Sequence, residues 1–559
     1  MSSRSRAILA VAALIVLTII LHGGATGGWW LSDDPQVLLH AMTETPATVL
    51  FSPPAWRYLS TSSFTPLVTI SFDLDLALAG LSPRFFYLHQ IGAIALAAVL
   101  LFFLLKDRER TLAAWTGAAI FIASPATVLA ARGLMVRHYV EGLVFALIAL
   151  LLWRAVHRAE DVRFRGLLSS LAAVAYLLAM LAKEFYAPLP LIMIWQARAA
   201  GASWRMLMTH LLPSAFSAAL YIVWRTWMLG SGGGYGESPE VSEMAMLPVT
   251  LWTAMTGRES AFLSAGIAAA GAVALAAAFR HRTRSTAGFL LAAGVFVFLP
   301  LAALAASFEP RYAFAGTAVF AAAAALAACA RDDRRFLAIP FSLLILLLAA
   351  GVNERRAIEH SSRATVAEGR YVWSQPGSAP PILATSPGWY LAGLESIRRI
   401  ETGAASPAYF LSTDAIVLSD LPADRFVRSV WGTTDVIPLD GPTKQAIAKS
   451  RASFVPDAPL EVLLERRRND IAWKVGPAGG TFSFITVPYY GNFPIGTTGR
   501  RRISESRERQ FFRIRRDLPN GGWTVSPIFE LPPRDGKVMW MRGSSVDSPE
   551  AAHFTYSQP

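Results

Sequence analysis

Long apolar runs fill most of the first 351 residues of the chain. A helix needs about 20 mostly apolar residues to cross a bilayer, and a shorter helix spans when it is packed or tilted. By this measure the pattern predicts eleven membrane-spanning helices. They lie near residues 7–22, 85–105, 112–131, 134–153, 166–182, 185–197, 208–229, 260–279, 286–306, 311–330 and 336–351. The first run is expected to be an uncleaved anchor, because Gly23 to Trp30 lacks a convincing small-x-small cleavage site before its tryptophans.

Basic residues gather on one side of these runs and give the predicted orientation. Loops rich in Lys and Arg are retained in the cytoplasm. Here they comprise Arg4, Arg6 and the segments 106–110, 154–165, 198–205, 280–284 and 331–335. The opposite, outer side then receives residues 23–84, the Gly-rich loop 230–259 and everything after the last run.

From residue 352 the pattern changes to that of a water-soluble domain. Short apolar alternations predict strands, and longer periodic stretches predict helices. The strands are expected at 415–418, 481–485 and 523–525, and the helices at 388–400 and 441–452. The predicted fold class is therefore a polytopic α-helical membrane protein over residues 1–351, followed by an extracytoplasmic α+β or mainly β domain over 352–559.

Composition supports this division. Of the 559 residues, 53% are hydrophobic and 16% are charged, with a mean hydropathy of +0.40, whereas soluble domains carry about a quarter charged residues. A simple soluble enzyme is excluded. The basic cytoplasmic loops explain much of the formal net charge of +12, so no nucleic-acid partner is expected. The single cysteine, Cys329, excludes an intrachain disulfide and a cysteine metal site.

Ionisable side chains stand at the predicted outer ends of the runs. Such groups in or beside a membrane span are costly and are therefore candidates for function. They are Asp33, Asp34, His89, Arg137, His138, Lys183, Glu184, Arg258, Glu259, Glu309 and Arg311, with Tyr312 beside the last. Carboxylates and cations thus gather at one predicted depth on one face of the membrane.

Lys183 stands out among these cations. Lys106 and Lys183 are the only lysines among the first 351 residues, and Lys183 lies on the outer side, against the charge bias. A compact ammonium is a point-charge ligand for phosphate, where arginine offers a planar fork. Lys183 therefore either binds phosphate or only pairs with Glu184 at the interface.

Asp33 and Asp34 precede Pro35, a sequence typical of a helix start. One aspartate is enough to cap a helix, so the second is a candidate catalytic base. His89 is either a ligand or a hydrogen-bonding residue between helices. The triplet Asp73-Leu74-Asp75 is set aside, because such triplets are frequent by chance and this one lies away from cytoplasmic nucleotide sugars.

The tail carries a basic run from Arg500 to Arg516 that includes Phe511 and Phe512. One interpretation is a site for an anionic lipid head group or an acidic glycan. The other is a solvated strand and loop with two core phenylalanines. The sequence favours the second.

The charges at the outer ends suit transfer of a sugar from a lipid phosphate. Asp33 or Asp34 would take the proton of an acceptor hydroxyl. The leaving group is already an anionic phosphate, so it needs cations more than a general acid, and Lys183, Arg137 and Arg311 are expected to supply them. Inversion at the anomeric carbon follows if attack is a single displacement. The residues identify no cofactor and leave a divalent-metal requirement open.

Several ordered segments also carry a resemblance to a known family. They are Phe64 to Phe72, Gly80 to Pro83, Tyr87 to His89, Ser124-Pro125 followed by Arg137, Leu181 to Glu184 with Pro188 to Pro190, and Glu309 to Tyr312. Across residues 30–315 the chain resembles protein O-mannosyltransferase-like enzymes of the GT-C superfamily. The strongest resemblance is to the membrane portion of TPR-containing transmembrane O-mannosyltransferases and their bacterial relatives.

The resemblance implies a GT-C-like fold and a polyprenyl-phosphate sugar donor. It implies that Asp33 or Asp34 occupies the acidic first-loop position regarded as catalytic. The donor phosphate and sugar site is expected to contain Arg137, Lys183, Glu184, Arg311, Tyr312 and His89. The chain departs from the family pattern at Thr65, where Arg is common, at Leu129, where an acidic residue is common, and in lacking a TPR period. The donor sugar and the acceptor therefore stay open.

Two other classes of function fit parts of the pattern. A transporter or flippase also uses outer-face charges, although midplane polar residues and duplicated halves, which are typical of transporters, are not evident in the sequence. A non-catalytic scaffold predicts that Asp33→Asn and Asp34→Asn keep full function. The partners expected of a transferase are membrane lipid, a polyprenyl-phosphate sugar, and a glycan, lipid or protein acceptor. Composition and the family resemblance together favour a bacterial inner membrane.

Overall fold

The structure is a computed structural model. It describes the chain apart from residues 1, 107–110, 231–239, 258–263, 270–282, 329–337, 420, 468–469, 488–491, 503–510, 534 and 543–559. The predictions made for Arg258, Glu259 and Cys329 lie outside the described residues, as does most of the predicted span 260–279.

The chain forms two compact units. The helical unit comprises Met1–Trp30, His40–Trp56 and Ser60–His360, and the C-terminal unit comprises Leu31–Leu39, Arg57–Leu59 and Ser361–Pro559. The short segment that holds Asp33 and Asp34 thus groups with the C-terminal part of the chain. The predicted boundary at residue 352 falls inside a continuous helix, α17 (Ala338–Ser374).

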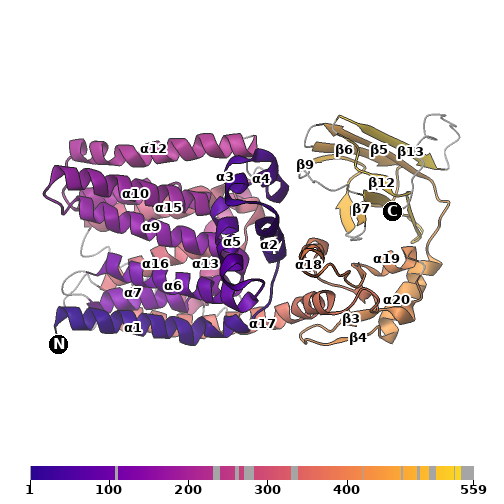
Figure 1. Ribbon diagram of the computed structural model, residues 1–559, viewed down its shortest axis with the longest axis horizontal. Coiled ribbons are helices and arrows are strands. Elements are labelled where there is room, and N and C mark those ends of the chain that lie inside the picture. Colours follow the sequence, from indigo (N-terminus) through magenta and orange to yellow (C-terminus); the bar gives the residue numbers. More distant parts are fainter. Residues whose placement is uncertain are drawn as a thin grey trace. The chain divides into compact units, whose positions relative to one another are not determined.

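The helical unit consists of apolar helices packed side by side (Figure 1). They include α1 (Ser3–His22), α6 (Pro83–Leu105), α7 (Thr111–Ala123), α8 (Pro125–Arg132), α9 (Arg137–Val156), α10 (Val162–Ala182), α11 (Leu189–Ala199), α12 (Trp204–Leu229), α13 (Val241–Thr256), α15 (Thr283–Ala302) and α16 (Ala313–Ala328). Within the described ranges, five helices are long and apolar enough to cross a membrane, or six if the bent pair α7–α8 is one span. The predicted polytopic helical class is confirmed, and the number of eleven spans stays a prediction.

Prolines set where several of these helices begin and bend. α6 and α8 each carry proline in the first turn, where a missing N–H loses no helical hydrogen bond. Ser124 caps α8 by accepting a hydrogen bond from the Thr127 amide at 3.3 Å. α7 and α8 meet at an angle of 55°, because the Pro125 ring is incompatible with a straight helix through this point. The span expected at 112–131 is therefore bent at this point.

The chain between α1 and α6 forms short helices. They are α2 (Asp34–Thr43), α3 (Pro46–Phe51), α4 (Pro53–Leu59) and α5 (Pro66–Ala79). Figure 1 shows α3 and α5 at one end of the long helices of the helical unit. α5 contributes to the buried network described below.

α12 exposes a row of large apolar side chains. They are Met208, Leu212, Phe216, Leu220, Val223 and Trp227. Their spacing of three or four residues places them on one face of the helix. An exposed apolar face of this length suits contact with lipid rather than with water.

The C-terminal unit contains a small α/β part. Its elements are β1 (Ile382–Leu383), α18 (Gly388–Thr402), β2 (Tyr409–Phe410), α19 (Thr413–Leu418), β3 (Val427–Ser429), β4 (Val436–Pro438) and α20 (Gly441–Ala452). The sheet order is β2-β1-β3-β4, with β1 parallel to both β2 and β3. Ile382 of β1 pairs with Tyr409 and with Val427. The two predicted helices are confirmed by α18 and α20.

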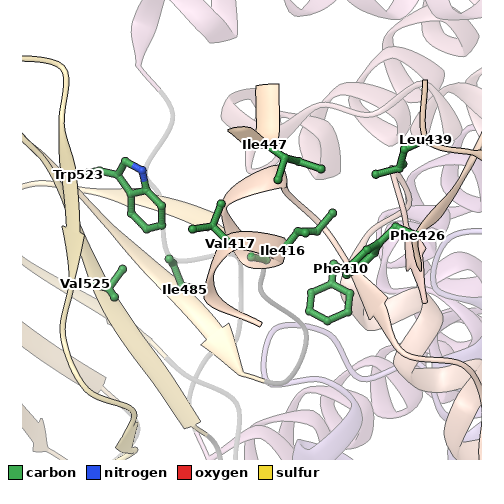
Figure 2. Close-up of a cluster of buried hydrophobic side chains, with 10 residues drawn as sticks. Phe410, Ile416, Val417, Phe426, Leu439, Ile447, Ile485, Trp523 and Val525 are labelled. Atoms are coloured by element: carbon green, nitrogen blue, oxygen red, sulfur yellow. The ribbon is translucent and has the colours of Figure 1, made fainter. Parts of the chain in front are cut away.

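The strand predicted at 415–418 is wrong, because these residues form the helix α19. Ser412 caps it by accepting a hydrogen bond from the Ala415 amide at 3.1 Å. Ile416 and Val417 both point into one apolar core, together with Ile447 of α20 (Figure 2). Consecutive apolar residues that are buried together fit a helical turn as well as a strand, so the local pattern could not decide between them.

The remaining strands form two antiparallel sheets. They are β5 (Leu460–Arg467), β6 (Asp470–Gly476), β7 (Thr481–Val487), β8 (Asn492–Ile495), β9 (Thr498–Arg502), β10 (Phe511–Asp517), β11 (Trp523–Val525), β12 (Phe529–Glu530) and β13 (Lys537–Arg542). One sheet has the order β11-β10-β7-β8, with β12 also paired to β10, and the other has the order β13-β5-β6-β9. Val462 and Leu464 of the second sheet share a core with Phe512 and Ile514 of the first. Two sheets that meet through such a core form a sandwich, so the predicted α+β or sandwich-like domain is confirmed.

Two arginines of the basic run are engaged inside the C-terminal unit. Arg516 is buried and donates hydrogen bonds to the carbonyls of Pro459 and Gly479, at 2.6 Å and 2.8 Å. Arg515 pairs with Asp414 and, at 2.7 Å, with Asp517. In the described part of the run, these contacts favour the structural interpretation over a ligand site.

Candidate functional site

Lys183 lies at a break between two helices of the helical unit. α10 ends at Ala182, Lys183 has an extended backbone, and a single turn, η3 (Glu184–Tyr186), follows before α11. The Lys183 side chain is only 6% exposed. A cation at the C-terminus of a helix interacts favourably with the helix dipole.

A glycine of α9 allows this turn to pack closely. An added Cβ at Gly142 would lie 2.3 Å from Cε2 of Tyr186, so a larger residue would displace the ring. The Tyr186 hydroxyl also donates a hydrogen bond to the Tyr139 carbonyl at 2.5 Å. η3 is thereby fixed against α9, and with it the position of Lys183.

A third residue, Arg225 of a distant helix, lies beside the pair of Lys183 and Glu184. Nζ of Lys183 lies 3.7 Å from Oε2 of Glu184, and Nη2 of Arg225 lies 3.9 Å from Oε1 of the same carboxylate. Arg225 comes from the last turns of α12 and also donates to the Ser62 carbonyl at 3.2 Å. Arg225 was not among the predicted site residues, although it too is an ionisable group near the predicted outer end of an apolar run.

Two tyrosine rings connect Lys183 with Arg311. Nζ of Lys183 lies 5.3 Å from the centre of the Tyr139 ring, and that ring lies 6.0 Å from the ring of Tyr312. Arg311 precedes Tyr312 in the turn η5 (Pro310–Tyr312) and pairs with Glu309 at 2.8 Å. The structure therefore brings together four of the predicted donor-site residues, Lys183, Glu184, Arg311 and Tyr312.

We call Lys183, Arg225 and Arg311 the cation cluster. Against their three positive charges stand the carboxylates of Glu184 and Glu309, so the group carries one net positive charge. The side chains of Arg225 and Arg311 are 17% and 19% exposed, which lets a ligand approach them. A cluster of this charge suits an anionic phosphate.

Arg137 and His89 lie in a different group of charged residues, which we call the buried network. Nη1 of Arg137 is 2.5 Å from Oδ2 of Asp75 and 3.2 Å from Oγ of Ser71. Its Nη2 donates to the Phe86 carbonyl at 2.7 Å. The guanidinium is thus occupied by groups of α5 and α6. These contacts hold the Arg137 guanidinium in place, and the phosphate-binding role expected of Arg137 stays a prediction.

His89 joins two carboxylates of the buried network. Its Nδ1 lies 2.7 Å from Oδ1 of Asp75, and its Nε2 lies 3.8 Å from Oε1 of Glu141. Ser71 donates a hydrogen bond of 2.5 Å to the same oxygen of Glu141. The contact with Asp75 fits the second of the two roles considered for His89, a hydrogen bond between helices, and its place in the donor site stays a prediction. Asp75 belongs to the triplet that was set aside as frequent by chance, and Glu141 does not stand out in the sequence, because its partners come from other helices.

Asp33 and Asp34 are used differently at the start of α2. The carboxylate of Asp34 is fully buried and accepts a hydrogen bond from the Leu31 amide at 2.8 Å. The carbonyl of Asp33 accepts hydrogen bonds from the amides of Gln36 and Val37, at 3.1 Å and 3.2 Å. Asp33 therefore caps the helix with its main chain, and the residue is partly exposed. Of the two aspartates, Asp33 is the better placed to meet a substrate.

In the described part of the chain, no three His, Cys, Asp or Glu side chains are arranged to hold a metal ion. The buried network is not a candidate metal site, because Arg137 already neutralises the carboxylate of Asp75. The divalent-metal requirement stays an open expectation.

Comparisons with known proteins give matches among solved structures alone. No protein-family model and no curated protein matches the chain. The chain is similar to the crystal structure of ArnT from Cupriavidus metallidurans in the apo state, with 13% identity, a TM-score of 0.42, and coverage of 75% of this chain and 91% of that chain. It is also similar to ArnT from the same organism bound to undecaprenyl phosphate, with 12% identity, a TM-score of 0.38, and coverage of 72% and 89%.

Proposed function

We propose that the chain is an integral-membrane glycosyltransferase that uses a polyprenyl-phosphate sugar as donor. This is the GT-C type of enzyme that its sequence resembles. The observation that carries the proposal is the cation cluster, in which Lys183, Arg225 and Arg311 gather at helix breaks and ends next to Tyr139 and Tyr312. The predicted orientation places it on the outer side of an inner membrane.

The cations would act on the phosphate of the donor. When the bond between the anomeric carbon and the phosphate oxygen breaks, its electron pair stays on the phosphate, so negative charge increases there. Fixed cations in a site of low dielectric stabilise that charge without reorganisation. Lys183 supplies a point charge, and Arg225 and Arg311 supply planar forks held in place by Glu184 and Glu309.

Asp33 would act as the general base, the role that the resemblance implies for one of the two aspartates. Its carboxylate takes the proton from the acceptor hydroxyl as the hydroxyl oxygen attacks the anomeric carbon. The products are the glycosylated acceptor, the polyprenyl phosphate and a protonated carboxyl group that later loses its proton to solvent. A single displacement of this kind inverts the anomeric centre. The acceptor is a lipid, glycan or protein hydroxyl.

The test is transfer of labelled sugar from a panel of undecaprenyl-phosphate sugars in membranes that contain the full chain. Lys183→Ala and Asp33→Asn are each expected to lower the rate by about 100-fold or more. Lys106→Ala is the matched control, because Lys106 is the other lysine of the first 351 residues and lies in a predicted cytoplasmic loop.

Binding is measured in parallel with undecaprenyl phosphate itself. Lys183→Ala should weaken it, and Asp33→Asn should not. Tight binding that Lys183→Ala weakens, without transfer from any donor of the panel, would favour the transporter or flippase. Binding that is absent, or that is equal in wild type and Lys183→Ala, would overturn the assignment of the cation cluster.

A further inference from the structure

Residues 31–39 are part of the C-terminal unit, although more than 300 residues of chain separate them from its α/β part. Two residues of α18, Trp389 and Gly393, contact this segment. They are four residues apart and therefore lie on the same face of the helix. The segment is thus held by one face of α18.

The first contact is a hydrogen bond. Nε1 of Trp389 donates to Oδ1 of Asp33 at 3.2 Å. The indole of Trp389 is 43% exposed, so this tryptophan is not needed to fill the core. A neutral N–H donor limits the rotamers of a carboxylate without neutralising its charge.

The second contact is a close approach of main chains. An added Cβ at Gly393 would lie 2.8 Å from Cβ of Pro35 and 3.2 Å from its carbonyl carbon. Glycine is unfavourable in the middle of a helix, and this approach explains its presence here. Val37 and Leu38, which follow in α2, are buried. The segment is therefore packed as well as hydrogen-bonded.

We propose that Trp389 is a positioning residue for the general base Asp33, and that the α18 face of the C-terminal unit exists to hold this base. The inference rests on the proposed function. It gives the C-terminal unit a role in the chemical step, in addition to any contact with the acceptor. A base that is held in one rotamer meets the acceptor proton more often than a freely rotating one.

The kinetic test is a double-mutant cycle on the full chain. Trp389→Phe keeps an aromatic ring and removes the N–H donor. We expect it to lower kcat by about tenfold while KM for the donor stays within about twofold, because orientation contributes to the transition state and not to donor binding. In the Asp33→Glu background, which retains a carboxylate base, Trp389→Phe should lower kcat by less than about twofold. The reason is that the carboxylate which Trp389 orients is already displaced in that background.

Trp431→Phe is the matched control. Trp431 belongs to the same unit and is 66% exposed, so its replacement should leave transfer unchanged. Equal losses for Trp389→Phe in the wild-type and Asp33→Glu backgrounds, or a loss that appears in KM alone, would contradict the positioning role.

A second measurement detects the hydrogen bond without any assay of transfer. In the full chain labelled with ¹⁵N-tryptophan, the indole resonance that disappears in Trp389→Phe should shift in Asp33→Asn. If it does not shift, the contact is absent and the inference is overturned, whatever the enzyme transfers. If it shifts but Asp33→Asn keeps full transfer, the assignment of Asp33 as the base fails, and the positioning role fails with it.

Discussion

Arg137 and Asp75 form an ion pair that solvent does not reach. Nη1 lies 2.5 Å from Oδ2, and the two side chains are 0% and 1% exposed. The guanidinium also lies 4.7 Å from the centre of the Phe72 ring. Breaking such a pair leaves a buried charge without compensation, which costs much more than the pair itself contributes.

Asp75→Asn is therefore expected to destabilise the protein by about 3–5 kcal/mol. The measurement is the apparent Tm of the purified chain in one detergent. Replacing both partners, as in Asp75→Leu with Arg137→Met, should recover part of the loss because the guanidinium and its partner carboxylate are removed together. As a control, Arg399→Ala removes an exposed pair with Glu395 and should cost less than about 1 kcal/mol. An unchanged Tm in Asp75→Asn would refute the structural role of the pair.

Arg225→Ala tests the cation that the sequence analysis missed. Removing this partner of Glu184 should raise KM for a polyprenyl-phosphate donor and lower kcat/KM by about 10-fold or more. Arg205→Ala is the control, because Arg205 is in the first turn of the same helix, at its predicted cytoplasmic end. A donor KM that is equal in the two variants would remove Arg225 from the site.

Glu368 should be the most sensitive carboxylate of the C-terminal unit. It is fully buried in α17 and accepts hydrogen bonds from the Thr385 amide at 2.8 Å, the Thr385 hydroxyl at 2.9 Å, the Ser386 amide at 2.8 Å and the Ser429 hydroxyl. Glu368→Ala leaves several buried donors unsatisfied, at about 1–3 kcal/mol each. We expect a protease to cleave the C-terminal unit faster in the full-length Glu368→Ala chain than in the full-length Glu395→Ala chain, which is the control. Equal cleavage rates would show that the network is dispensable.

Asp440 should make the stability of the C-terminal unit depend on pH. Its carboxylate caps α20 by accepting from the Thr443 amide at 3.0 Å, and the hydrogen bonds of Thr443 lower the pKa of Asp440 below its ordinary value of 3.8. A lowered pKa in the folded state means that the unfolded chain binds the proton more tightly. The stabilisation is therefore complete well above pH 3.8 and is lost as the pH falls through the folded pKa.

The measurement for Asp440 is the urea midpoint of the C-terminal transition between pH 6 and pH 3. Asp440→Asn keeps a capping oxygen but does not titrate, so its midpoint should fall less steeply over this interval. Identical slopes in wild type and variant would show that another carboxylate is responsible.

The sequence by itself determined the class of the protein and part of the candidate site. The helices α18 and α20 and the strands β7 and β11 lie where the pattern predicts them, because their periodicity matches the face that each buries. Lys183 and Arg311 could be identified because a charge beside an apolar run is costly whatever its neighbours are. The same reasoning pointed to Asp33 and Asp34 without distinguishing between them.

Only the tertiary structure decided which charges belong together. Arg137 and Asp75 are 62 residues apart in the chain, and Trp389 and Asp33 are 356 residues apart. Hydropathy and periodicity report whether a residue is buried, but they do not report what it is buried against, since that depends on which helices pack. For the same reason the pairing of Arg137 with Asp75 could not be predicted, and Arg225, which lies beside Glu184, was overlooked.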